Sequence, residues 1–382
     1  MELLLGILIG LVVLVVLIVL HELGRAIVAR RNGVVVEEFE IGFPPRAWKK
    51  KLNNGVLFSL NWLPVGGFVR LKGEHDSARG EGTYGQASFW VKTKILFAGV
   101  AVNWLSAALL LSVMAVWGIP RIIPNQVILP FDNTVTYSPV EVYDVTEGSP
   151  ADKLGLEEGD IIQKIGDVNI TTYDEMRMIT ESMAGETVTI NFSRADDEMT
   201  GQVALNTAEE AVSEGYLGVR STQASSVSAT WSAPILGVAT AGQLTYETVA
   251  GLGSMLGKTF TGFFGQFSGD ETTREVAKQD LNQVGASVAG PLGILGVIFP
   301  SVVDAGIMQV LLLAAIISLT LAVMNLLPIP ALDGGRWFTM AIFRLFKKEL
   351  TKEREENIQA AGFLTLMILM VLVTWSDVGK IF

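Results

Sequence analysis

The sequence has no cysteine, few histidines and few charges for its length. Its 382 residues include no Cys and only 2 His, and 18% of them are charged. Without thiols the chain forms no disulfide, has no thiolate nucleophile and builds no cysteine zinc site. Because an ordinary soluble domain carries about 25% charged residues, this deficit indicates that part of the chain lies in lipid. The apolar share of 50% excludes a disordered chain and a protein that coats nucleic acid.

Four long stretches lack charged residues, and each is close to the roughly 20 residues that a helix needs to cross a bilayer. We predict transmembrane helices at about residues 3–28, 95–119, 307–332 and 358–375. The first stretch is not typical of a secretory signal peptide, because Glu2 replaces the usual basic start and no small-residue cleavage site follows. We therefore expect a polytopic α-helical membrane protein that keeps its first helix.

Basic residues are distributed unevenly between the connecting segments. Residues 21–94 hold 12 of the 28 Lys and Arg, and the short segment 333–357 holds six, whereas the much longer segment 120–306 holds nine. Since Lys and Arg concentrate in cytoplasmic loops, residues 21–94 and 333–357 are predicted to be cytoplasmic. Both termini and segment 120–306 are then outside, which places the chain in the cell (inner) membrane as a multi-pass protein.

The outer segment contains a compact α/β module. Alternating apolar residues predict strands at Val140–Val145, Ile161–Ile165 and Thr187–Phe192. Helices are predicted at Ser149–Leu156, which opens with Ser-Pro, and near Tyr173–Met183, which follows a Thr-Thr pair suited to an N-cap.

Two motifs in this module resemble those of PDZ domains. The run from Glu147 to Ile162, with Gly-Ser-Pro-Ala-Asp-Lys-Leu-Gly-Leu, carries the first, and a Tyr-Leu-Gly-Val loop carries the second. The resemblance implies a PDZ domain over residues 136–220 that binds peptide termini, because such domains add an extended peptide to a sheet edge. The loop that would receive the peptide carboxylate consists of Tyr216, Leu217, Gly218 and Val219. A PDZ-shaped spacer that only limits access is the alternative.

The chain is thus divided into a membrane core of two halves, residues 1–120 and 307–382, with the module and a further region between them. Residues 221–306 mix apolar side chains with Gly, Ala, Thr and scattered polar residues such as Gln243 and Lys258. This pattern predicts amphipathic helices at the membrane interface rather than a fifth span.

Ionisable residues lie at the ends of two predicted spans. His21 and Glu22 follow the first apolar run, and Asp333 follows the third. Because ionisable groups at membrane depth are costly, they indicate a functional site. A His-Glu-x-x-His helix binds zinc through two imidazoles on one face and uses its Glu to activate water. In this chain the fifth position of that pattern is Arg25.

The surrounding motifs resemble those of the site-2 protease family of intramembrane zinc metalloproteases, in its bacterial form with an inserted PDZ domain. The resemblance covers nearly the whole chain. Its motifs are His-Glu-Leu-Gly-Arg-Ala-Ile-Val-Ala-Arg at 21–30, Leu-Pro-Val-Gly-Gly-Phe-Val at 63–69, Ala98-Gly99 with Asn103, Ala-Gly-Pro-Leu-Gly at 289–293, and Asn-Leu-Leu-Pro-Ile-Pro-Ala-Leu-Asp-Gly-Gly at 325–335.

The resemblance implies His21 and Asp333 as ligands of Zn²⁺ and Glu22 as general base and acid. It implies a membrane-entering β hairpin at about 55–72 that holds substrate in extended form. The residues expected to contact substrate are Asn325, Asn103, Gly66, Gly67 and Phe68. The expected function is cleavage of single-span membrane proteins during regulated intramembrane proteolysis, with the lipid bilayer as surroundings and no nucleic acid as partner.

Arg25 departs from the family pattern, since a guanidinium has no lone pair for a metal and stays protonated. Three interpretations are open. Arg25 bridges Glu22 and Asp333 in an inactive site; another group, such as His75, completes the zinc coordination; or Arg25 is a single substitution in an active enzyme. The alternative function is therefore a pseudoprotease that binds membrane partners through its groove and PDZ domain.

Overall fold

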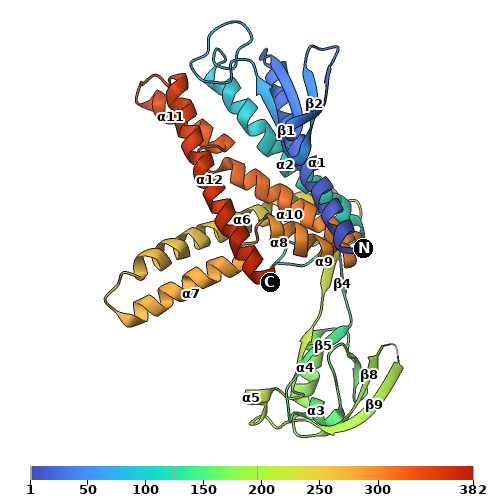
Figure 1. The fold of residues 1–382 in the computed structure, drawn as a ribbon. Helices are drawn as coiled ribbons and strands as arrows, with labels where there is room; N and C mark the ends of the chain where they lie inside the picture. Colours follow the sequence, from blue (N-terminus) through green and yellow to red (C-terminus); the bar gives the residue numbers. More distant parts are fainter. Residues whose placement is uncertain (1, 124, 196, 382) are drawn as a thin grey trace. The chain divides into compact units, whose positions relative to one another are not determined.

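The computed structural model describes residues 2–123, 125–195 and 197–381. The chain forms two compact units, which are described separately: unit 1 comprises Met1–Met114 and Pro234–Phe382, and unit 2 comprises Ala115–Ala233 (Figure 1). Unit 1 contains the long helices and a small sheet, and unit 2 contains the remaining strands with three short helices.

Four helices of the described residues are long and apolar enough to cross a membrane, or five if one bent pair counts as a span. They are α1 (Glu2–Arg31), α2 (Phe89–Trp117), α10 (Ile307–Leu326) and α12 (Lys352–Ile381). Their number confirms the prediction of four spans by length and composition.

The third span is shorter than its predicted range of 307–332. Helix α10 ends at Leu326, and Leu327 has the extended backbone angles φ −64° and ψ 147°. Pro328 and Pro330 explain this end, because proline lacks an N–H and forces the residue before it out of the helical region. A new helix, α11 (Asp333–Leu345), begins directly after this loop.

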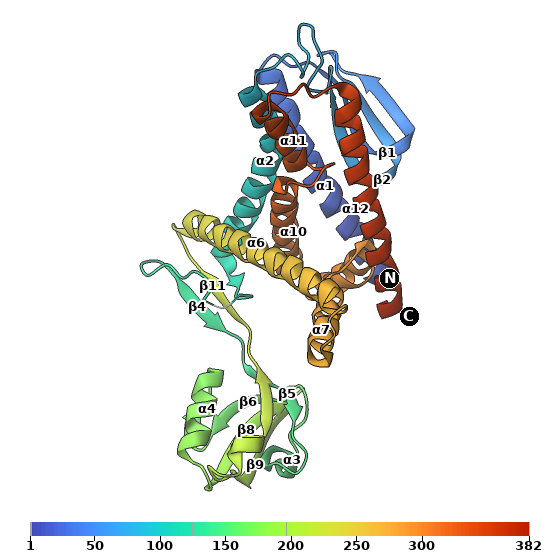
Figure 2. The ribbon, with the colours of Figure 1, turned by 90° about the vertical axis from the view of Figure 1, so that its left-hand side faces the viewer.

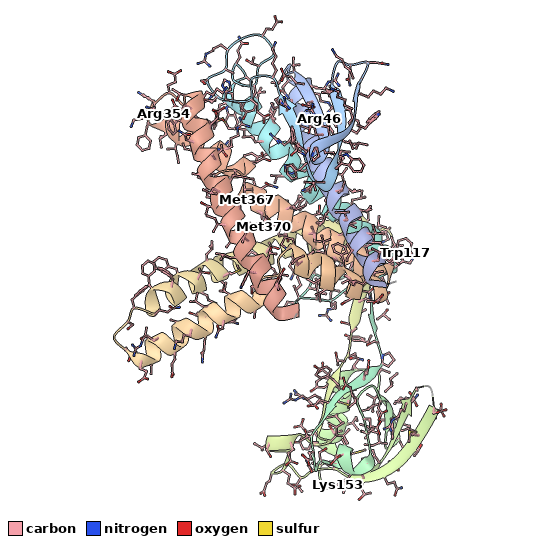
Figure 3. The ribbon with its side chains drawn as sticks, viewed as in Figure 1. Arg46, Trp117, Lys153, Arg354, Met367 and Met370 are labelled. Carbon is pink, nitrogen blue, oxygen red and sulfur yellow. The ribbon has the colours of Figure 1, made fainter. Side chains whose placement is uncertain are left out.

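The predicted hairpin is part of a larger sheet. β1 (Val36–Lys51) pairs antiparallel with β2 (Leu57–Leu71), and Glu38 is paired with both Arg70 and Leu57. Because the first part of β1 therefore lies between two parts of β2, the hairpin expected at 55–72 is integrated with residues 36–51. Figure 3 shows the labelled Arg46 on this sheet.

Most of the residues from 234 to 304 in unit 1 are helical. The helices are α6 (Ala233–Gly265), α7 (Glu271–Ser287), α8 (Pro291–Gly293), a π-helical turn (Ile294–Ile298) and α9 (Phe299–Asp304). Trp104 of α2 donates from Nε1 to Thr245 Oγ1 of α6 at 3.0 Å, which ties the first half of α6 to a membrane span. Figure 1 shows α6 and α7 joined as a helical hairpin, and Figure 2 shows the same pair turned by 90°. Their interfacial location stays a prediction.

Unit 2 confirms the predicted elements of the module. Its largest sheet has the order β10-β5-β6-β8-β9, with β7 paired to β6. The module elements are β5 (Val140–Val145), α3 (Pro150–Leu154), β6 (Ile161–Ile165), β7 (Val168–Asn169), α4 (Tyr173–Ser182), β8 (Thr187–Arg194), β9 (Asp197–Ala204), α5 (Ala211–Glu214) and β10 (Val219–Thr222). A second sheet contains β3 (Ile119–Pro120), β4 (Thr134–Tyr137) and β11 (Ser225–Ser228).

Candidate active site

Helix α1 carries three ionisable side chains on one face at its charged end. His21, Glu22 and Arg25 are 7%, 9% and 9% exposed. Residues one turn apart lie on the same side of a helix, so the spacing of 21 and 25 brings the imidazole and the guanidinium to one surface. Burial of three ionisable groups requires that their charges be paired.

Helix α2 packs directly against this face through small residues. A Cβ atom on Gly99 would lie 2.5 Å from the His21 ring, and one on Gly24 would lie 2.7 Å from Val102. Any larger residue at 99 would therefore push the imidazole away. The Ala98-Gly99 pair that the sequence singled out serves this close approach.

Asp333 reaches the site because the chain turns sharply after α10. It is the first residue of α11. A Cβ atom on Gly335 would lie only 1.9 Å from the carbonyl oxygen of Ile329, so the first turn of α11 fits against this loop only with glycine. The result is a contact of 3.0 Å between His21 Nε2 and Asp333 Oδ2, across 312 residues of chain.

The guanidinium of Arg25 lies among three carboxylates. Its Nη1 donates to Glu22 Oε2 at 3.1 Å, its Nη2 donates to Glu74 Oε1 at 3.0 Å, and its Nε is 3.8 Å from Asp333 Oδ1. Burial alone would raise the pKa of Asp333, but Arg25 and His21 together hold that pKa below its ordinary value. The geometry agrees with the first interpretation of Arg25, in which it bridges Glu22 and Asp333.

A second arginine extends this network into the loop after β2. Arg336 Nη1 lies 2.9 Å from Glu74 Oε1, and Arg336 also pairs with Glu355 of α12 at 3.0 Å. Sequence analysis missed Glu74, Arg336 and Glu355. Arg336 and Glu355 lie a few residues from the predicted spans 307–332 and 358–375, and this position could have identified them because buried charges near a membrane boundary need partners.

The predicted substrate residues come from three further elements. Asn103 of α2 is 1% exposed, and neither atom of its side-chain amide has a hydrogen-bond partner among the described residues. Asn325 is the next-to-last residue of α10 and is partly exposed. A Cβ atom on Gly67 of β2 would lie 3.6 Å from Ile18, one turn before His21, and Gly66 and Phe68 flank it.

His75, the second histidine, lies near the site without completing a metal shell. It lines a cavity of about 340 Å³ together with Arg25, Asp333 and Arg336. Its Nδ1 is 3.3 Å from Ser77 Oγ. Within the described part of the chain, no group of three or more His, Asp or Glu could hold a metal ion.

The predicted peptide-binding loop lies in unit 2, just before and at the start of β10. The carbonyl oxygen of Leu217 accepts from the amide of Ala151, and that of Gly218 accepts from the amide of Thr146, both at 2.9 Å. Leu217 is 3% exposed. Since β10 ends the strand order of its sheet, its outer edge is where a further strand could add.

The sequence is similar to proteins named as zinc metalloproteases over most of its length. The model of peptidase family M50 matches residues 9–369. A protein of Clostridium perfringens whose name describes a zinc metalloprotease is 28% identical over 362 residues, covering 95% of this chain and 95% of that protein. Zinc metalloprotease RasP of Shouchella clausii is 28% identical over 437 residues, covering 96% of this chain and 97% of RasP.

Among solved structures, the PDZ domain of an SdrC-like protein from Listeria monocytogenes is 23% identical in sequence. The match covers 25% of this chain and 94% of that domain, with a TM-score of 0.20.

The relatives are named as zinc metalloproteases, but a zinc ion does not fit the residues at this site. A catalytic zinc generally takes three protein ligands and a water. In this chain His21 and Asp333 contact each other, and the position expected for a third ligand carries the cationic Arg25, which repels a metal ion. The described residues therefore form a site whose cation is a guanidinium.

Proposed function

Because the chain belongs to peptidase family M50 and is by family a metalloendopeptidase, we propose that its substrates are single-span membrane proteins. Their membrane segments would be received beside His21, Glu22 and Asp333, in the setting of regulated intramembrane proteolysis. The observation that carries this proposal is the contact of 3.0 Å between the buried His21 of α1 and Asp333 at the start of α11, which lie 312 residues apart in the chain.

The sheet beside α1 supports the receipt of an extended segment. A transmembrane helix hides its amides, so a cleavable bond must first be unwound and its freed amides paired. The segment Gly66, Gly67 and Phe68 of β2 lies against α1 one turn before His21 and has the strand geometry such a partner needs. The buried amide of Asn103 supports a contact with substrate backbone, because leaving it without a partner is costly.

The distribution of basic residues supports a cytoplasmic location for the site. Arg46 on the sheet and Arg354 at the start of α12 lie at the same end of unit 1 in Figure 3. Helices α2 and α10 connect residues 120–306 to the end of the membrane core that carries the candidate active site. Residues 120–306 would then lie on the outer side of the cell membrane. The lipid bilayer surrounds the core in this arrangement.

The module of unit 2 would select substrates outside the membrane. We interpret it as a PDZ domain from its sequence motifs and the order of its elements. A peptide terminus would bind at Tyr216, Leu217, Gly218 and Val219 and add to the edge of β10.

A second candidate function is binding without hydrolysis. It is favoured by one observation: Arg25 pairs with Glu22 at 3.1 Å and with Glu74 at 3.0 Å, at the position where the family has a metal ligand. In such a pseudoprotease, Glu22 is neutralised by the guanidinium and is held away from a proton-transfer role. Hydrolysis in the manner of the family would require a ligand in place of Arg25.

The two candidates are separated by measuring zinc content and cleavage in the full-length protein. The purified chain is compared with Arg25→His, using a single-span membrane protein as reporter substrate. If Arg25 is the only defect, Arg25→His gains about one zinc per chain and cleaves the reporter, while the parent does neither. If the parent itself holds zinc and cleaves, the binding-only candidate is wrong.

A double variant, Arg25→His with Glu22→Gln, is the matched control. It should keep the zinc of Arg25→His and lose cleavage, because Gln cannot move a proton. Retained cleavage would exclude Glu22 as the general base. If Arg25→His binds neither zinc nor substrate, the proposal that this site receives membrane segments is wrong.

A further inference from the structure

A second cavity lies on a different face of α1 from the candidate active site. Its volume is about 320 Å³, and its walls are the α1 face of Val19, Leu23 and Ile27 and the sheet residues Phe39, Ile41 and Phe58. His21, Glu22 and Asp333 are not among the residues that line it. At 3.6 residues per turn, positions 19, 23 and 27 lie on one side of α1 and positions 21, 22 and 25 on another. The cavity is therefore separate from the site.

Polarity changes along this cavity in one direction. The apolar end is at Val19 and Ile41, since Ile41 pairs with Gly67 and a Cβ on Gly67 would lie 3.6 Å from Ile18. The polar end is at Arg30 and Asn54. Arg30 follows Val19 by 11 residues, which corresponds to about 16 Å along the helix axis. The cavity is thus an apolar channel with one cationic end.

The cationic end has charge available for a ligand. Arg30 is exposed in the last turn of α1, and none of the ion pairs of the described residues includes it. Basic side chains at the end of a membrane span attract anionic lipid headgroups.

We propose that this cavity binds one acyl chain of an anionic phospholipid, with the lipid phosphate at Arg30. The polar end of the cavity lies where α1 ends, and its apolar end lies at membrane depth. A phospholipid within one leaflet has the same orientation, with its headgroup at the surface and its acyl chains inside. A protein segment fits less well, because its backbone amides would face the aliphatic and aromatic walls without partners. An acyl chain has no such groups.

Lipid binding to the full-length protein in detergent tests this proposal. After removal of lipid, phosphatidylglycerol and phosphatidylcholine are added separately, and bound lipid is counted by native mass spectrometry. Phosphatidylglycerol should bind about fivefold more tightly than phosphatidylcholine, as expected for one headgroup contact with Arg. Arg30→Gln should abolish this preference, whereas Arg31→Gln, one residue beyond the cavity, should keep it.

Filling the cavity tests the acyl-chain half of the proposal. Leu23→Trp places a large ring in the channel and should weaken binding of both lipids, whereas Leu105→Trp, at an exposed leucine of α2, should not. Equal effects of Arg30→Gln and Arg31→Gln would overturn the assignment of the phosphate to Arg30. If Leu23→Trp leaves lipid binding intact but weakens binding of an apolar peptide, the cavity holds a protein segment and the proposal is wrong.

Discussion

The module of unit 2 and the candidate active site of unit 1 both depend on buried charges, but they gather them over very different lengths of chain. In the module, Asp160 is 0% exposed and pairs with Arg194, only 34 residues away, at 2.8 Å. At the site, Arg25 joins α1 to a loop that begins after β2, and His21 joins α1 to α11. The comparison shows that the ion pair of the module joins two strands that already pair in one sheet, whereas the Arg25 network joins elements that no sheet connects.

The largest expected effect comes from removing the shared cation of the site. Arg25→Leu leaves Glu22, Glu74 and Asp333 without that partner, and breaking a buried ion pair in this way costs about 3–5 kcal/mol. Thermal unfolding of the detergent-solubilised protein measures it. Arg25→Lys keeps the charge but loses the forked contacts, so its loss should be intermediate.

The matched control for this change is Arg31→Leu, at an exposed position of the same helix. Its effect should stay within about 0.5 kcal/mol. If Arg25→Leu is as mild as Arg31→Leu, the network does not hold the elements of the site together, and the contrast with the module is lost.

An intermediate effect is expected inside the module. Burial would raise the pKa of Asp160, but hydrogen bonds from Arg194 and from the amide of Glu157 hold that pKa below its ordinary value. Asp160→Asn should destabilise the module by about 1–3 kcal/mol at neutral pH. Hydrogen exchange of the amides of β5, β6 and β8 in the full chain measures this change.

The sign of the pH dependence follows from the lowered pKa of Asp160. The ionised carboxylate stabilises the folded state above the unfolded pKa of about 3.9, and this contribution is lost as the pH falls through the lower folded value. The parent and Asp160→Asn should therefore converge in acid. Asp167→Asn, at an exposed turn, is the control and should match the parent at every pH. A constant difference between Asp160→Asn and the parent in acid would contradict the assignment.

The smallest effect tests a purely local signal. Thr172 caps α4, with its side chain accepting from the amide of Glu175 while the Glu175 carboxylate accepts from the amide of Thr172. Thr172→Ala should cost about 1 kcal/mol, seen as faster hydrogen exchange in the first turn of α4. Thr172→Ser keeps the hydroxyl and should behave as the parent. If the two variants exchange equally fast, the cap does not set the stability of this helix.

The elements of the module were predictable because their signals are local. Ser149 caps α3 and Thr172 caps α4, each through residues within three positions. The spans were predictable for a similar reason, since apolar length alone identifies them. The predicted end of the third span lies beyond the end of α10, because the apolar run continues through Pro328 and Pro330. These prolines end the helix although the residues around them are apolar.

The composition of the active site was only partly predictable. His21, Glu22, Arg25 and Asp333 stand out as charges at the ends of apolar runs, and the bridge from Arg25 to Glu22 follows from their spacing on one helix. Glu74 carries no such signal, because its pairing with Arg336 depends on where the loop after β2 contacts α11. The residue pattern within the loop and within α11 does not specify where the two contact each other.

The sequence by itself determined the four apolar spans, the elements of the inserted module and the cation at position 25, because each depends on residue type and local spacing. Only the tertiary structure decided that this cation is shared by Glu22, Glu74 and Asp333, and that α1 presents the site on one face and an apolar cavity on another. The physical reason is that charge pairing and cavity shape are set by distances between elements, which hydropathy and helix period do not contain.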